Sequence, residues 1–173
     1  AVVAAPQFVQ GPSARYGHSM AYDSQRQVVV LFGGNSNNSW PSGALNDTWE
    51  WDGQSWHLMT PQNAPSPRGY GAMAFDAARG VAVYVGGYDG GHLSDTWEWD
   101  GADWTLRASV GGPGPMYHHM MVYDAARQII VLFGGYRSGT NIGETWEYDG
   151  STWSQVVVGG PSARRHHSMV YDS

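Results

Sequence analysis

The chain has 173 residues, with 24 Gly, 9 Pro, no Cys and a formal net charge of −6. Its charged residues form no basic stripe, which argues against nucleic acid as a partner because phosphate binding needs clustered Lys and Arg. The lack of Cys excludes disulfides, thiolate metal sites and cysteine nucleophiles, and no run of 18 apolar residues predicts a membrane span.

A seven-residue motif occurs three times at almost equal intervals. It reads Asp-Thr-Trp-Glu-Trp-Asp-Gly at 47–53 and 95–101, and Glu-Thr-Trp-Glu-Tyr-Asp-Gly at 144–150, so its starts lie 48 and 49 residues apart. A period near 50 residues is typical of repeat architectures. Residues that recur at one repeat position are therefore expected to build the fold, and recognition is expected where the copies differ.

Each unit is expected to contain four strands. The first unit shows them in order: a segment ending in aromatic-Asp at 18–23, an apolar run into a glycine pair at 28–34, the seven-residue motif at 47–53, and a short segment around Trp56. Trp49 and Trp51 alternate with polar residues, which is the period of a strand. The Asp-Gly that ends each motif predicts a tight hairpin into the fourth strand.

The same four segments follow in the second and third units, and a last copy at 160–173 supplies only the first segment. A unit of four strands has two apolar faces that it cannot bury alone. Stacking such units around an axis buries both faces, which is the principle of a β-propeller.

The unit resembles the kelch repeat in the order Pro-x-Arg…His, apolar run into Gly-Gly, Asp-x-Trp-x-(Trp/Tyr)-Asp and a spaced Trp, over residues 11–173. The resemblance implies an all-β, kelch-type β-propeller as a single domain over 1–173. It would have three complete four-stranded blades at about 11–60, 64–110 and 112–158, plus the first strand of a further blade at 160–173. The motif resembles kelch repeats of exported bacterial proteins, so an extracellular or periplasmic location is expected, with a cytoplasmic one left open.

Three blades do not close a ring, and open apolar faces are costly. The ring is expected to be completed either by a homo-oligomer, such as two chains of three blades, or by the remaining blades of a longer chain. Residues 1–9 resemble a degenerate end of a fourth strand. The extra first strand at 160–173 would duplicate the one at 11–23 of a partner, which favours a piece of a longer propeller.

Most of the conspicuous side chains recur and are interpreted as structural. Eight tryptophans are expected to pack between blades: Trp49, Trp51, Trp56, Trp97, Trp99, Trp104, Trp146 and Trp153. Trp40 lies in an insertion, where it either is exposed for binding or folds back on its own blade. The Glu and Asp of each motif are expected to cap turns and bind strand-edge backbone, because a repeated pair offers no two distinct environments for acid/base work.

The histidines allow two interpretations. His18, His119 and His167 match the kelch histidine and are expected to be satisfied structural groups. His118 and His166 vary between units and are candidates for a ligand. Adjacent strand residues face opposite ways, so a His-His pair does not supply two ligands to one ion. Zinc or iron stays a lesser alternative, and no cofactor is expected.

In kelch proteins the loops before the first strand and after the second commonly share one rim of the channel and hold the ligand contacts. Residues at these positions differ between copies and are rich in Arg, Tyr and Asn, as recognition surfaces are. The resulting candidate ligand-binding residues are Arg15, Tyr16, Asn35, Ser36, Arg68, Tyr70, Tyr88, Asp89, Tyr117, His118, Tyr136, Arg137, Arg164, Arg165 and His166.

These positions favour a non-catalytic recognition or scaffold propeller that binds a protein segment or a glycan. The alternative is a sugar-acting enzyme of the kelch-propeller type, epimerase- or lyase-like. A copper-radical oxidase is excluded because its cofactor requires a Cys cross-linked to Tyr. The Glu-x-x-x-Asp-x-x-x-His type of iron motif is also missing, since Gln54, Ala102 and Ser151 stand four residues after the motif glutamates.

Overall fold

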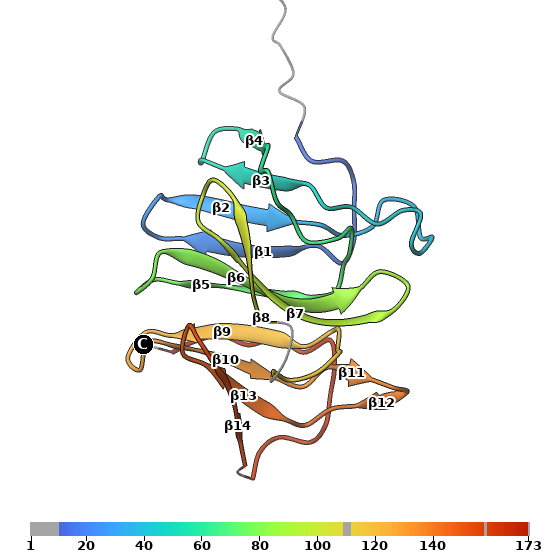
Figure 1. Cartoon of the computed structure of the whole chain (residues 1–173), viewed down its shortest axis with the longest axis vertical. Helices are drawn as coiled ribbons and strands as arrows, with labels where there is room; N and C mark the ends of the chain where they lie inside the picture. The colour runs from blue at the N-terminus through green and yellow to red at the C-terminus, as the bar shows by residue number, and fades with distance from the viewer. Residues whose placement is uncertain (1–10, 109–111, 158, 173) are drawn as a thin grey trace, which may run out of the picture.

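The computed structural model describes residues 11–108, 112–157 and 159–172. Within these ranges the chain forms four antiparallel sheets of two to four strands and no helix (Figure 1), which confirms the all-β class. The described part thus contains no helix of the length and apolar character that crossing a membrane requires. Closure into a ring and the number of blades stay predictions, and the strand end predicted at 1–9 lies outside the described residues.

Three of the sheets have four strands each. The first has the order β1-β2-β3-β4, with β1 at Ser19–Asp23, β2 at Val28–Phe32, β3 at Thr48–Trp51 and β4 at Trp56–Met59. The second is β5-β6-β7-β8, with β5 at Ala72–Asp76, β6 at Val81–Tyr88, β7 at His92–Trp99 and β8 at Trp104–Ala108. The third is β9-β10-β13-β14, with β9 at Met120–Asp124, β10 at Ile129–Phe133, β13 at Thr145–Tyr148 and β14 at Trp153–Val156. A two-stranded ribbon pairs β11 (Tyr136–Arg137) with β12 (Thr140–Asn141).

The hairpin between the third and fourth strands of each sheet is held by the motif aspartate, as predicted. The Asp52 carboxylate accepts hydrogen bonds from the backbone N–H groups of Gln54 and Ser55 at 2.7 and 2.8 Å. In the third sheet Asp149 caps the same turn, and the N–H groups of Thr152 and Ser151 hold the pKa of its carboxyl below its usual range. The Asp that precedes the motif glycine therefore stabilises the turn.

The three large sheets stack face to face along the long axis of the molecule (Figure 1), and their first strands adjoin: β1 contacts β5, and β5 contacts β9. Two apolar clusters fill the spaces between the sheets. Phe32 and Trp104 pack between the first and second sheets, and Ile130 and Trp153 between the second and third. Buried aromatic rings of this size contribute a large share of the core.

The same type of hydrogen bond joins each pair of successive sheets, from a tryptophan ring of one sheet to the seven-residue motif of the preceding sheet. Trp104 Nε1 donates to Thr48 Oγ1 at 2.8 Å, and Trp153 Nε1 donates to Thr96 Oγ1 at 3.0 Å. Trp99 Nε1 likewise donates to the Glu50 carboxylate. The structure thus confirms that Trp99, Trp104 and Trp153 pack between units.

Trp97 and Trp146 also pack against the clusters between the sheets, as predicted, whereas the motif glutamates behave differently from the sequence prediction. Trp49, Trp97 and Trp146 donate to the acidic residue two positions earlier in their own sheet. The motif glutamates were expected to bind strand-edge backbone, but they do not. Each carboxylate instead forms an ion pair with the Arg in the turn after the first strand, because a partly or fully buried carboxylate needs a cationic partner. The pairs are Glu50 with Arg26, Glu98 with Arg79 and Glu147 with Arg127.

Residues 160–172 form no strand, unlike the prediction. A first strand takes its ladder bonds from the second strand of its own unit, and the described chain has no second strand after 160–172. The segment still follows the path of a first strand. Tyr171 Oη accepts the N–H of Ala126 at 3.2 Å, as Tyr123 Oη accepts that of Ala78 in the preceding unit.

The motif glutamates allow a matched test of burial. The Glu98 side chain is 2% exposed and binds Arg79, Arg107 and Tyr148, whereas that of Glu147 is 29% exposed and pairs with Arg127. Glu98→Gln is expected to lower the free energy of unfolding by about 2–3 kcal/mol, because charged hydrogen bonds in a buried site are lost. Glu147→Gln should cost below about 1 kcal/mol. Urea unfolding measures both, and equal losses would contradict the packing described here.

Candidate functional site

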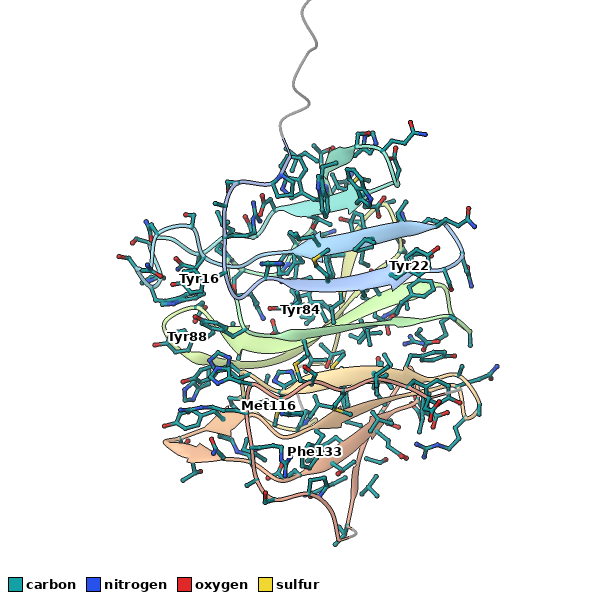
Figure 2. The ribbon with its side chains drawn as sticks, turned by 180° about the vertical axis from the view of Figure 1, so that it is seen from behind. Tyr16, Tyr22, Tyr84, Tyr88, Met116 and Phe133 are labelled. Carbon is teal, nitrogen blue, oxygen red and sulfur yellow. The ribbon has the colours of Figure 1, made fainter. Side chains whose placement is uncertain are left out.

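Two sets of loops meet at one end of the sheets. Tyr16 pairs through its backbone with Asn35, Gly69 with Tyr88, and Tyr117 with Tyr136, so the loop before each first strand is joined to the loop after the second. Figure 2 shows Tyr16 and Tyr88 at this end of the molecule, whereas Tyr22 lies at the opposite end of the sheets. The shared edge expected from the kelch resemblance is therefore present.

Aromatic side chains from all three large units gather at this edge. They form the aromatic surface, which we define as Tyr16, Trp40, Tyr70, Tyr88, His92, Tyr117, His118 and Tyr136. Tyr117 lies at its centre, with ring centroids 5.2 Å from Tyr88, 5.0 Å from His92 and 5.6 Å from Tyr136. Each ring of the surface is partly exposed, so the rings pack on one another and still face solvent.

A line of left-handed residues runs across the units beside this surface. Gly17, Tyr70, His118 and His166 occupy one repeat position, with φ values of 65°, 61°, 59° and 57°. Backbone bonds join them: Tyr70 N–H donates to Gly17, His118 N–H to Tyr70, and His166 N–H to His118. A Cβ at Gly17 would lie 2.7 Å from the Tyr70 ring, so only glycine fits beside that ring.

The rings on this line contact one another. The His118 ring lies 4.2 Å from Tyr70 and 3.8 Å from His166, measured between centroids. A cavity of about 140 Å³ opens beside them and is also lined by His18 and Met120. Left-handed backbone is unfavourable for bulky residues and concentrates at functional sites. The line therefore points to this edge as the place where side-chain identity matters.

His118, Tyr70 and Tyr117 are uncharged at neutral pH. Burial and, to a lesser extent, the neighbouring His166 and Arg165 lower the pKa of His118 to about 4. Burial also raises the pKa of the Tyr70 and Tyr117 hydroxyls, which remain protonated and able to donate. The guanidinium of Arg165 stacks over the Tyr136 ring at 4.1 Å and supplies a positive charge at one end.

Three predicted ligand-binding residues turn inward and are removed from the candidate site. The Arg15 side chain is 4% exposed and donates to the Asp47 carboxylate and the Gly33 carbonyl. Arg68, 3% exposed, makes the equivalent bonds to Asp95 and Gly86. Asn35 is fully buried, where it donates to the Ser39 carbonyl. Arg15 and Arg68 hold their loops to the segments of the third strands, and Asn35 holds its own loop together.

The remaining predicted residues divide between the surface and its margins. Ser36 is exposed but donates to Gly43, and the Asp89 carboxylate accepts the N–H of Gly91 within its own turn. Arg137 is held by Glu144 and the Pro113 carbonyl. Arg164 is exposed and donates to Ser162, whereas Arg165 and His166 border the aromatic surface.

Two members of the surface were not in the predicted set. Trp40 stays partly exposed and does not fold onto its own sheet, because its ring lies 5.6 Å from Tyr70 and 5.5 Å from Tyr88 of the next unit. His92 begins β7 and packs against Tyr88 and Tyr117. Both come from the segment between the glycine pair and the motif, which differs in length between units, and that difference was the available signal.

His119, expected to be structural, is 1% exposed. Its ring nitrogens have no hydrogen-bond partner of ordinary geometry in the described part of the chain, so it is not the satisfied group that was expected. No group of three or more His, Asp or Glu within the described ranges is arranged to hold a metal ion. A comparison with models of protein families finds no match for this chain.

The burial of His119 predicts a pH dependence of stability. Burial lowers the pKa of His119 to about 3. Between pH 6.5 and 3 this ring is therefore protonated in the unfolded chain but neutral in the folded chain. Unfolding free energy should fall as pH drops from about 6.5 towards 3, and His119→Leu should reduce that slope by up to about 1.4 kcal/mol per pH unit. Met121→Leu, at a buried position without a titratable group, serves as the control. An unchanged slope in His119→Leu would contradict a neutral buried ring.

Proposed function

We propose that this chain is a non-catalytic recognition module of the kelch-repeat β-propeller type, and that it binds an extended segment of another protein along the aromatic surface. The observation that carries the proposal is the continuous set of ring contacts from Tyr16, in the first unit, to Tyr136, in the third. The repeat builds the scaffold, and the aromatic surface occupies positions where the repeats differ.

The propeller interpretation is supported by how closely the units approach. A Cβ at Gly33 would lie 2.4 Å from the Arg68 carbonyl oxygen of the next unit, so the glycine pair is needed where the backbones meet. Gly34 N–H donates to that carbonyl at 2.8 Å, and the same bond recurs from Gly87 and from Gly135 to the unit that follows each. One rule of stacking repeated between successive units is what a propeller requires.

The chemistry of the surface supports a protein segment as the ligand. Tyr, Trp and Arg are the residues that dominate binding energy at protein interfaces, and they pair large apolar rings with hydroxyl or guanidinium donors. Rings that are fixed by neighbouring rings lose little conformational entropy on binding. Aromatic-lined surfaces also suit extended proline-rich segments, whose backbone is already stiff.

An enzymatic role has less support at this edge. Acid/base catalysis needs two groups in different environments within reach of one substrate. Among the predicted rim residues the carboxylate is Asp89, which is engaged by Gly91 N–H in its own turn. His118 has a lowered pKa and lacks a carboxylate partner among the bonds formed by the described residues, so it is a neutral ring in a contact surface.

The proposal predicts that Tyr117 dominates binding. Peptides selected from a displayed library of random dodecamers against the immobilised chain should bind Tyr117→Ala roughly 30-fold more weakly, a loss of about 2 kcal/mol that is usual for a central tyrosine. Tyr22→Ala should leave the affinity unchanged, because Tyr22 is 55% exposed at the opposite end of the sheets. Titration calorimetry measures both variants.

A glycan array probed in parallel separates the two ligand classes. Selected peptides that bind Tyr117→Ala and the unmodified chain equally would overturn the proposed surface. Glycans that require Tyr117, together with no selected peptide that does, would overturn the protein-segment ligand in favour of a carbohydrate.

A further inference from the structure

Gly69 lies beneath the aromatic surface, and an indole ring of the first unit takes the place of the side chain that this residue lacks. Tyr16, Gly69 and Tyr117 occupy one repeat position, so the second unit has no ring of its own there. A Cβ at Gly69 would lie only 2.9 Å from Cη2 of Trp40. The Trp40 ring fills this place and lies 5.5 Å from the Tyr88 ring. The loop of the first unit therefore makes the row of rings continuous across the second unit.

The loop that carries Trp40 is held by hydrogen bonds of its own. The Asn35 side chain donates to the Ser39 carbonyl, and Gly43 N–H donates to the same carbonyl, both at 2.8 Å. Ser36 N–H donates to the Gly43 carbonyl at 2.9 Å. An indole presented by a braced loop loses little conformational entropy when a ligand packs on it.

Four rings of the surface follow one another at nearly even steps. Along Trp40, Tyr88, Tyr117 and Tyr136 the successive ring centroids lie 5.5, 5.2 and 5.6 Å apart. A polyproline II helix rises about 3.1 Å per residue, so a segment of roughly six residues covers this row. Such a segment already has its bound conformation in solution, which lowers the entropic cost of docking on aromatic rings.

The polar groups that this row presents can all donate a hydrogen bond. Among the described residues the indole N–H of Trp40 has no acceptor, and it is not buried, so it is open to a ligand. The hydroxyls of Tyr88, Tyr117 and Tyr136 likewise have no protein partner in this part of the chain. Burial raises the pKa of the Tyr117 hydroxyl, which therefore stays protonated and donates at neutral pH. The row thus offers donors beside its ring faces.

The backbone carbonyls beneath the rings already accept hydrogen bonds. Gly69 and Tyr88 exchange two N–H···O bonds at 3.1 and 2.8 Å, and Tyr117 and Tyr136 exchange two at 3.3 and 2.8 Å. An ordinary extended peptide brings a backbone N–H with each residue, and covering such a group without an acceptor is costly. Proline has no backbone N–H and brings only a carbonyl oxygen, so it suits a surface that donates.

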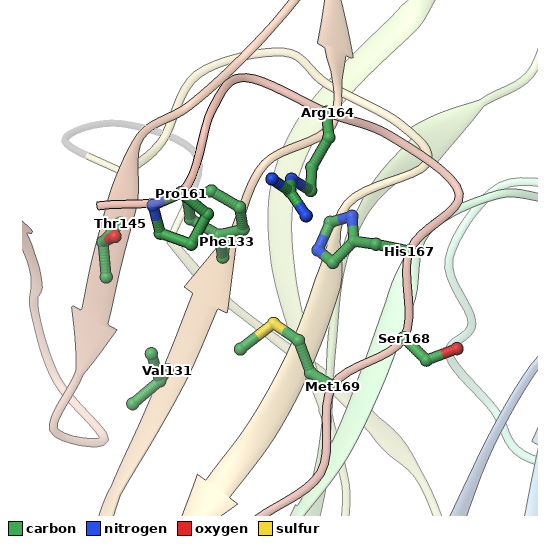
Figure 3. A pocket seen from close by; sticks show the side chains of 8 residues that line it. All are labelled: Val131, Phe133, Thr145, Pro161, Arg164, His167, Ser168 and Met169. Carbon is green, nitrogen blue, oxygen red and sulfur yellow. The ribbon is translucent and has the colours of Figure 1, made fainter.

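A separate pocket of about 310 Å³ lies between the third sheet and the segment 160–172 (Figure 3). Val131, Phe133 and Met169 give it an apolar lining, and none of its lining residues belongs to the aromatic surface. A proline-rich segment needs ring faces and donors side by side. The row of rings offers both, so it is the site on which the ligand class is argued.

We propose that the protein segment bound by the aromatic surface is proline-rich and adopts the polyproline II conformation, an inference that rests on the proposed function and specifies its ligand. Its proline rings pack on Trp40, Tyr88 and Tyr117, and its carbonyl oxygens accept from the indole N–H and the tyrosine hydroxyls. Trp40 sets this specificity, because an indole N–H donates and cannot accept. A glycan fits less well, since sugar hydroxyls also donate and the carbonyls beneath the rings are engaged.

Labelled decaproline is the direct probe, with fluorescence anisotropy as the readout. It should bind the unmodified chain, whereas a Gly-Ser peptide of the same length should not. Trp40→Phe and Tyr117→Phe each keep a ring and remove one donor, so each should weaken decaproline binding roughly fivefold, as the loss of one hydrogen bond does. Tyr22→Phe makes the same chemical change at the opposite end of the sheets and should leave the affinity unchanged.

Decaproline that fails to bind at millimolar concentration, or that binds both phenylalanine variants as tightly as the unmodified chain, would refute the proline-rich ligand. The displayed library separates this failure from failure of the proposed function. Selected peptides that require Tyr117 but contain no more proline than the unselected library would contradict the ligand class and leave the recognition surface standing. Peptides that bind without Tyr117 would remove the surface itself, and the inference with it.

Discussion

The hydrogen bond from an aromatic ring of one unit to the Thr or Glu of the motif in the preceding unit is the interaction on which the stack depends. Trp104 to Thr48 and Trp153 to Thr96 repeat the same geometry across two interfaces. Each bond requires the ring to enter the space between two sheets, so burial and hydrogen bonding specify the same arrangement. An indole with no acceptor there would bury an unsatisfied N–H, which costs about 1–3 kcal/mol.

The motif glutamate adds a buried charge to this interface, which must be matched by cationic and hydrogen-bonding partners. Glu98 is buried between the second and third sheets, where it accepts from Tyr148 and is paired with Arg79 and Arg107. A buried carboxylate is tolerated only when its hydrogen bonds and charge are matched. The Asp that precedes the motif glycine, by contrast, bonds only within the local hairpin. One seven-residue motif therefore fixes the turn of its own sheet and the contact with the next.

Repetition allowed the sequence to predict the all-β class and the strands of the three complete units, but it misled the assignment of Arg15 and Arg68. Their partners, Asp47 and Asp95, lie about thirty residues away, and no local pattern joins them. The third unit, which lacks this Arg, held a sequence signal for the pairing. The third unit has Met116 in place of the Arg and Glu144 in place of the Asp, and both changes occur together. Arg137, from the loop after the second strand, pairs with Glu144 instead.

The candidate site was harder to predict because its members come from segments that do not align. Tyr117 and His118 occupy repeat positions and were identified, whereas Trp40 and His92 belong to insertions of unequal length. Only the folded chain shows that Trp40 crosses to the neighbouring unit and covers Tyr70. Contacts between side chains of different units produce no periodic pattern in the sequence when the side chains lie in segments of unequal length.

The left-handed line at this edge connects the fold with its proposed role. The backbone bonds that join Gly17, Tyr70 and His118 hold successive units together, and the same residues carry the rings beside the aromatic surface. Glycine takes this conformation without steric cost, as Gly17 does, so the rings at the later positions are kept against a backbone preference. A ligand that contacts Tyr70 and His118 together rests on two units at once. Its binding therefore stabilises the stacked arrangement over any state in which the units separate.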